Sequence, residues 1–189
     1  DRYYLYRSEW NKDSHTLHVL PHWTWPGREG KVTPVFVYTD YPSAELFING
    51  KSQGVRFKND STVLNRYRLM WNETVYDPGN IKVVAYDKDK QAVDSVTVYT
   101  AGKPDHLVLS PDKKEMKADG EDLVYVKVSV VDKNGNLCPF DSRLISFDVN
   151  GAGYFRAVAN GDPTCLESFQ KPEMHAFAGM LTAIIESKT

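Results

Sequence analysis

Leu123-Val-Tyr-Val-Lys-Val-Ser-Val-Val131 alternates valine with other side chains along its length. Successive side chains of a β-strand point to opposite faces of the sheet, so this alternation predicts a strand with one buried and one solvent-facing side. The polar segment 132–136 follows it and contains Asn-Gly, which is typical of a tight turn. We interpret it as a hairpin turn and not as a calcium loop, because an EF-hand needs glycine at its sixth position and glutamate at its twelfth.

The same alternation by two recurs along the chain between short polar turns, whereas almost no stretch repeats apolar residues at helical spacing over about ten positions. It predicts further strands at 16–20, 32–39, 44–48, 54–58, 66–71, 81–87, 92–100, 106–110, 144–149, 154–158, 174–177 and 180–186. Asn49-Gly50 is typical of a two-residue type I′ hairpin. Short, closely spaced strands of this kind predict an all-β chain built from sandwiches.

Ala101-Gly-Lys-Pro104 resembles a domain linker, because small, flexible residues precede a stiff proline. A chain of 189 residues is long enough for two domains of roughly 90 residues each. We therefore predict two tandem β-sandwich domains, residues 1–102 and residues 103–189.

The composition excludes several classes of function. Lys and Arg number 23 and Asp and Glu number 25, so the net charge of -2 offers no basic surface for nucleic acid. No apolar run approaches the roughly 18 residues that span a bilayer, so we expect no membrane span. The chain begins at Asp1 with aromatic residues crowded behind it, from which we expect a piece of a longer protein.

We expect neither a cofactor nor a metal site. His15, His18 and His22 would line one face of a helix, but the prolines and tryptophans that follow favour an extended chain, in which His15 and His18 point to opposite faces. Cys138 and Cys165 lack the spacing of a zinc site, and the sequence leaves open whether they pair. No nucleophile, hydrolytic-metal or nucleotide-binding motif occurs, so we expect no active site in this chain.

One loop carries candidate contact residues. His22-Trp-Thr-Trp-Pro-Gly-Arg-Glu-Gly30 places two indoles and a charged pair in a segment stiffened by proline. Exposed indoles stack on the C–H faces of sugar rings, and they also pack against neighbouring domains. The candidates for a sugar or interdomain contact are His22, Trp23, Trp25, Arg28 and Glu29. Since the two indoles lie two residues apart, we expect both to project to one side, and the sandwich to stay folded when both become alanine.

Several segments resemble one family. The loop at 22–30 is similar to the HW-x-WPG-x-EG loop of glycoside hydrolase family 2 enzymes, specifically bacterial β-galactosidases of the Bacteroides type. Val-Phe-Val-Tyr-Thr at 35–39 and Glu-Leu-Phe-Ile-Asn-Gly-Lys-Ser-Gln-Gly at 45–54 resemble the V-x-VYT…ELF-x-NGKS-x-G stretch. Residues 4–10 are similar to the segment that leaves the catalytic barrel. The segments that resemble the family's next immunoglobulin-like domain are 118–123, 131–137, 160–163 and 176–179.

The resemblance implies two tandem immunoglobulin-like β-sandwiches, with a barrel-exit segment at 1–10, behind a (β/α)8 barrel. It places the sugar-cleaving glutamates on that barrel before residue 1, so no catalytic residue is assigned to this chain. The chain departs from the family pattern at Ala178, where relatives often have Asn, and at 187–189, where relatives usually continue into one more strand. The second sandwich would then be truncated, with an exposed edge.

The expected function is that of non-catalytic accessory domains of a β-galactosidase that hydrolyses terminal β-galactosides. They would brace the catalytic barrel of the same parent chain and shape its cleft. The alternative is a carbohydrate-binding module with its own sugar site, and a third class is a cell-surface or adhesion repeat. The barrel is thus the expected partner, with a glycan in the alternative; the oligomeric state and the identity of the glycan stay open. The resemblance favours a periplasmic or extracellular location.

Overall fold

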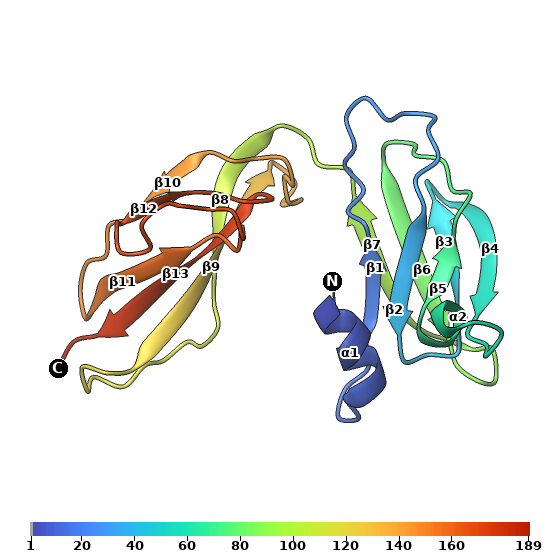
Figure 1. Ribbon diagram of the computed structural model, residues 1–189, viewed down its shortest axis with the longest axis horizontal. Helices are drawn as coiled ribbons and strands as arrows, with labels where there is room; N and C mark the ends of the chain where they lie inside the picture. The colour runs from blue at the N-terminus through green and yellow to red at the C-terminus, as the bar shows by residue number, and fades with distance from the viewer. Residues whose placement is uncertain (1) are drawn as a thin grey trace. The chain divides into compact units, whose positions relative to one another are not determined.

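The computed structural model describes residues 2–189 (Figure 1). The chain divides into two compact units, the first ending at Thr100 and the second spanning Ala101–Thr189. The predicted boundary lay between residues 102 and 103, and independent folding of each half stays a prediction. No helix in the described part of the chain is long and apolar enough to cross a bilayer.

The first unit is a sandwich of two antiparallel sheets, with strand orders β1-β2-β5 and β4-β3-β6-β7 (Figure 1). Its strands are β1 (Leu17–Leu20), β2 (Val35–Thr39), β3 (Ser43–Ile48), β4 (Lys51–Phe57), β5 (Leu69–Trp71), β6 (Asn80–Tyr86) and β7 (Ala92–Tyr99). Two helices accompany them, α1 (Arg2–Trp10) and α2 (Val63–Tyr67).

Both helices were missing from the sequence-based prediction. Helix α1 occupies the segment expected only as a barrel exit, and α2 replaces the first part of the strand predicted at 66–71, of which β5 remains. Thr62 begins α2, because its side chain accepts a hydrogen bond from the backbone N–H of Asn65 as an N-cap does. The helices have 9 and 5 residues, too few for helical spacing to be recognised over about ten positions.

The core of the first unit lies between its two sheets. Val35 and Val37 of β2 are fully buried together with Leu46 of β3 and Val83 of β6. The β3–β4 hairpin closes through Asn49-Gly50, whose φ angles of 48° and 78° are both positive, as a type I′ turn requires. The predicted hairpin is therefore confirmed.

The second unit is also a sandwich, but its two sheets are unequal. A four-stranded sheet has the order β11-β13-β9-β8, and a two-stranded sheet pairs β10 with β12 (Figure 1). The strands are β8 (Pro104–Pro111), β9 (Leu123–Asp132), β10 (Leu144–Ser146), β11 (Gly153–Ala159), β12 (Glu173–His175) and β13 (Met180–Ser187). The predicted fold class, an all-β chain of two sandwiches, is confirmed.

The core of the second unit is concentrated at one end of strand β9. Val128 and Val130 are buried, whereas Val124 and Val126, which the alternation predicts on the same buried side of the strand, are only half-buried. Every residue of the adjacent edge strand β8 is exposed. The smaller sheet therefore leaves part of the larger sheet without apolar cover.

Candidate functional site

The two tryptophans of the predicted contact loop occupy different environments. Trp23 has no exposed surface and belongs to the core of the first unit. Its indole N–H donates to the carbonyl oxygen of Asp77 over 2.9 Å, and its ring meets Tyr76 edge to face at 5.1 Å. The expectation that both indoles project to one side is wrong for Trp23, because this side chain packs inside the core of the first unit.

Trp25 is the half-buried member of the pair. Its ring stacks on His22 with centroids 4.1 Å apart, and its indole N–H donates to the carbonyl oxygen of His22 over 2.9 Å. The guanidinium of Arg28 lies 5.9 Å from the Trp25 ring, within cation–π range. Burial lowers the pKa of His22, so the ring that supports Trp25 is neutral at pH 7.

These residues border an apolar hollow of about 400 Å³ on the first unit. Its lining consists of Leu20, Pro21, Trp25, Arg28, Thr33, Pro34 and Phe36. Arg28 donates to the carbonyl oxygen of Val32 over 2.9 Å, and Glu29 accepts a hydrogen bond from the backbone N–H of Gly27. Both charged side chains thus stabilise their own loop, while the Trp25 face of the hollow is suited to a flat apolar group.

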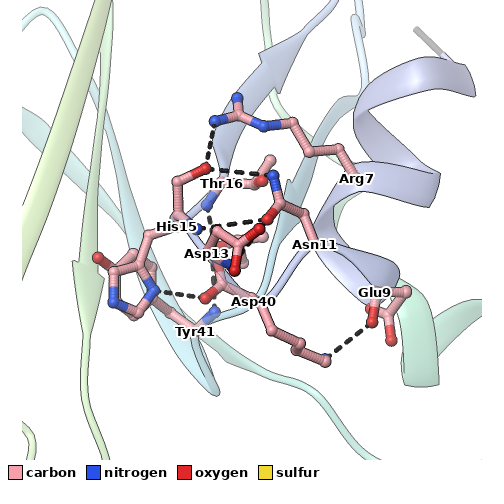
Figure 2. Close-up of polar contacts among 11 residues, drawn as sticks. Arg7, Glu9, Asn11, Asp13, His15, Thr16, Asp40 and Tyr41 are labelled. Atoms are coloured by element: carbon pink, nitrogen blue, oxygen red, sulfur yellow. Dashed lines mark hydrogen bonds and ion pairs between the residues drawn. The ribbon is translucent and has the colours of Figure 1, made fainter.

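A second candidate surface surrounds helix α1, which polar contacts fasten to the first sandwich (Figure 2). Glu9 of α1 forms an ion pair with Lys58, the residue that follows β4, and the two charged atoms are 2.8 Å apart. Asp40 accepts hydrogen bonds from the backbone N–H of Thr16 at 2.6 Å and from His15 at 2.5 Å. These contacts hold both ends of the segment that connects α1 to β1.

The Asp40 carboxylate is stabilised in its charged form. Burial of this side chain acts to raise its pKa, but the hydrogen bonds from Thr16 and His15 outweigh that effect and lower the pKa. His15 also stacks on Tyr41 with ring centroids 4.7 Å apart. The junction at Asp40 is therefore a charged, hydrogen-bonded anchor at neutral pH.

One face of α1 presents aromatic side chains to the outside. Tyr3, Tyr6 and Trp10 are 68%, 50% and 74% exposed, and the last two stack at 4.8 Å. On the other side of the helix, Tyr4 stacks on His18 of β1 with ring centroids 3.7 Å apart. A hollow of about 340 Å³ opens beside the exposed stripe, lined by Leu5, Tyr6, Glu9, Trp10 and Tyr67. Exposed aromatic area of this kind marks an interaction surface.

Sequence reasoning identified the Trp25 loop and missed the α1 anchor. The aromatic spacing 3, 6 and 10 was a helical signal in the sequence, since residues three and four apart share a helix face. Nothing in the sequence pointed to Lys58 or Asp40, because their partners lie far away along the chain. The contact role predicted for His22, Trp25, Arg28 and Glu29 stays a proposal.

In the second unit, Cys138 is a buried thiol and Cys165 a half-buried one, and the two are not bonded to each other. Residues 2–189 hold no cluster of three or more His, Cys, Asp or Glu side chains arranged to bind a metal ion. The turn that begins at Asp132 is closed by hydrogen bonds from the backbone N–H groups of Asn134 and Asn136 to that carboxylate, both 2.9 Å.

Comparison with protein families gives two matches. Residues 107–189 match the model described as glycoside hydrolase family 2 C-terminal domain 5, and residues 30–94 match a domain of unknown function, DUF4982. A β-galactosidase of Bacteroides ovatus, BoGH2A, is 40% identical over 188 residues, which are 99% of this chain and 21% of that protein. A putative β-glucuronidase of Formosa agariphila is 31% identical over 177 residues, 93% of this chain and 17% of that protein.

Solved structures agree with these matches. A β-glycosidase from Bacteroides vulgatus superposes with a TM-score of 0.89 at 34% identity, covering 100% of this chain and 23% of that one. A glycosyl hydrolase family 2 member from Bacteroides cellulosilyticus superposes with a TM-score of 0.85 at 30% identity, covering 98% of this chain and 27% of that one. The chain spans about a fifth of the length of the two curated relatives named above.

Proposed function

Because this chain belongs to the C-terminal region of glycoside hydrolase family 2, we propose that it is a non-catalytic part of a β-galactosidase and braces the catalytic barrel of its parent chain. The choice of a galactoside is supported by the 40% identity to a β-galactosidase along nearly the whole chain. The β-glucuronidase relative is 31% identical, which makes a glucuronide the competing substrate class.

The observation that carries the bracing role is the way α1 is held. The Glu9–Lys58 ion pair and the Asp40 anchor fix the helix on the first sandwich. The aromatic stripe of Tyr3, Tyr6 and Trp10 stays exposed on the helix that these contacts hold. A helix fastened on one side and aromatic on the other is suited to joining the sandwich to a second packed body.

The hollow beside Trp25 supports a second contact of the same kind. Trp25 is held by His22 and Arg28, so little side-chain freedom is lost when a partner packs on it. In the bracing proposal this partner is the barrel or the rim of its substrate cleft. In the alternative, a carbohydrate-binding module, it is a sugar ring.

The substrate is tested with the full-length parent polypeptide. It is expected to cleave a nitrophenyl β-galactoside faster than the matching β-glucuronide, and the reverse preference would overturn the galactosidase assignment. Residues 1–189 alone are expected to cleave neither. Turnover that survives rigorous purification and responds to point mutations in this chain would contradict the non-catalytic role.

The bracing role is tested in the same parent with the double variant Tyr6→Ala/Trp10→Ala. Loss of the aromatic contact should lower the melting temperature of the catalytic domain by several degrees. A loss of 1 kcal/mol corresponds to about 2–4 °C in a domain of roughly 150–250 residues. Residues 1–189 carrying the same changes should keep their own stability. The matched control is Tyr99→Ala, since this tyrosine of β7 is 53% exposed and lies outside α1. Equal melting temperatures for the unchanged parent, the double variant and the Tyr99→Ala control would exclude bracing through α1.

The sugar-binding alternative has a separate test. Residues 1–189 would be titrated with galacto-oligosaccharides by calorimetry, alongside the variant Trp25→Ala. Binding that disappears in the variant would establish the module, and the absence of binding supports the brace.

A further inference from the structure

The second unit has a hollow of its own, with a volume of about 530 Å³. It lies between the loop that follows β11 and the end of β12, and Ser142, which comes shortly before β10, also lines it. A volume of this size is within the range of small-molecule sites, which combine apolar walls with a few well-placed polar groups. The hollow is formed entirely by residues of the second unit, so it belongs neither to the Trp25 loop nor to the surface around α1.

The side-chain donors of this hollow are already used within it. The amide Nδ2 of Asn160 donates to the carbonyl oxygen of His175 over 3.0 Å and to the sulfur of Cys165 over 3.6 Å. The Cys165 thiol in turn donates to Glu167, with the sulfur 3.8 Å from Oε1. Nδ1 of His175 lies 3.2 Å from the other Glu167 oxygen, and since a carboxylate only accepts, Nδ1 carries the proton. Among the described residues that line the hollow, the hydroxyl of Ser142 is the one side-chain donor that remains.

The groups that remain free in the hollow are mainly acceptors. Asp162 accepts hydrogen bonds from the backbone N–H and the hydroxyl of Thr164 through Oδ1 alone, so its Oδ2 has no hydrogen-bond partner in the described chain. The neutral His175 ring, protonated at Nδ1, presents Nε2 as a further acceptor. The hydroxyl of Ser142 accepts as well as donates. A ligand that matches this hollow therefore supplies several hydrogen-bond donors.

The charge of the hollow selects among donor-rich ligands. Asp162 and Glu167 are both carboxylates, and the hydrogen bond from His175 lowers the pKa of Glu167, so Glu167 is charged at neutral pH. None of the described residues that line the hollow is Lys or Arg. The guanidinium of Arg143, which comes directly before β10, is paired with Asp141 at 2.8 Å. The hollow thus attracts a cation and repels an anion such as a carboxylated sugar.

Apolar side chains form the rest of the wall. Phe177 is 44% exposed and Leu166 is 99% exposed, so both have surface left for a ligand. A cation over the face of an aromatic ring is attracted by the ring quadrupole, and an alkyl group gains from leaving water for an exposed leucine. A neutral sugar matches less well, because its hydroxyl oxygens also need donors, and Ser142 supplies the one side-chain donor left in the described part of the hollow.

We propose that this hollow binds a primary ammonium group carried on a short alkyl chain. The three N–H groups of the ammonium donate to Asp162, to Nε2 of His175 and to the hydroxyl of Ser142. The alkyl chain lies against Phe177 and Leu166. The site belongs to the second unit alone, so it depends neither on the bracing role nor on the choice between a galactoside and a glucuronide.

The thiol of Cys165 lines the hollow and reports whether it is occupied. The intact parent polypeptide is treated with iodoacetamide at neutral pH, with and without pentylammonium chloride, and peptide mass spectrometry follows alkylation of Cys165. Cys138 is buried and lies outside the hollow, so its alkylation reports any loss of structure. Pentanol, which has the same alkyl chain without the charge, is the ligand control, and methyl β-galactoside represents a neutral sugar.

Pentylammonium at ten times its dissociation constant should slow alkylation of Cys165 about tenfold, because only the free site reacts. Equal concentrations of pentanol or of methyl β-galactoside should leave the rate unchanged. Unchanged alkylation with pentylammonium would overturn the proposal. So would equal protection by pentanol, which would show an apolar hollow, or by the galactoside, which would show a sugar site.

The variant Asp162→Asn tests the charged contact. It keeps the acceptor for Thr164 and removes the charge, so the pentylammonium concentration that gives half-protection should rise about tenfold. Asp105→Asn, at an exposed position outside the hollow, is the matched control and should leave this concentration unchanged. Equal half-protection concentrations for Asp162→Asn and the unchanged parent would contradict the role of the carboxylate.

A second variant keeps the proposal testable if Asp162→Asn alters the loop, which alkylation of Cys138 would reveal. Phe177→Leu retains an apolar wall without the aromatic face and should raise the half-protection concentration about threefold. An unchanged concentration would contradict the contact with the ring. The side chain of lysine carries the same ammonium group as a free alkylamine, and acetyl-lysine amide separates the two sources. Stronger protection by this compound than by pentylammonium would identify a peptide lysine as the ligand, and weaker protection a free alkylamine.

Discussion

The ammonium of Lys58 lies 2.8 Å from a carboxylate oxygen of Glu9 and so joins the residue after strand β4 to helix α1. The two side chains are 18% and 29% exposed, which makes the pair better shielded from solvent than a surface ion pair. Because it links segments that are 49 residues apart in sequence, it constrains the position of the helix more than any contact within α1 does.

We predict that Lys58→Met loosens α1 without unfolding the sandwich. The free energy that holds α1 on the sandwich should fall by about 1 kcal/mol, because a partly buried carboxylate loses its partner. This value is at the upper end of the range for solvent-accessible ion pairs. Hydrogen exchange of the α1 backbone amides should become faster, while exchange in β3 and β6 stays unchanged. Lys51→Met, at an exposed position of β4, is the control and should leave α1 as it is. Equal exchange in both variants would show that the ion pair does not hold the helix.

Replacing the two tryptophans one at a time should separate a core residue from a surface residue. Trp23→Ala removes a fully buried indole and should cost about 3–5 kcal/mol of unfolding free energy. Trp25→Ala removes a half-buried ring and should cost only about 1 kcal/mol. Urea denaturation of residues 1–189, followed by circular dichroism, measures both. Similar losses for the two variants would contradict the difference in burial.

The Asp132 carboxylate should make the second unit sensitive to acid. Burial acts to raise its pKa, but hydrogen bonds from the N–H of Gly102 and from Asn136 and Asn134 outweigh burial and lower the pKa to about 2. Because the folded pKa lies below its ordinary value of 3.8, the carboxylate stabilises the fold above that pH. This stabilisation is lost as the pH falls toward 2.

The variant Asp132→Asn tests this dependence. At pH 7 it should be less stable than the wild type by about 1–3 kcal/mol, because an amide group faces buried N–H donors. The difference should shrink as the pH falls from 3.8 toward about 2. Thermal melts of the wild type and the variant at several pH values in this range measure the stability difference. Asp105→Asn, at an exposed position, is the control. A difference that is constant with pH would mean that the charge of Asp132 plays no part.

Local patterns in the sequence determined most of the strands. Period-two alternation places side chains on opposite faces whatever the rest of the chain does, so strand positions could be derived from neighbouring residues alone. Asn49-Gly50 likewise determined its own turn, because both residues accept the positive φ that a type I′ hairpin requires. The family motifs in the loop at 22–30 led to the same family that the comparisons identify.

Only the tertiary structure decided which of these residues are buried and which meet each other. Trp23 and Trp25 lie in one short loop, yet one indole is in the core and the other lines a surface hollow, because Tyr76 and Asp77 come from a distant part of the chain. The attachment of α1 likewise depends on Lys58, which lies 49 residues from Glu9 along the chain. Val124 and Val128 belong to a single alternating stretch, but only Val128 is buried, because burial depends on the opposite sheet. Side-chain direction is a property of the local backbone, whereas burial and pairing depend on what the folded chain places opposite each side chain.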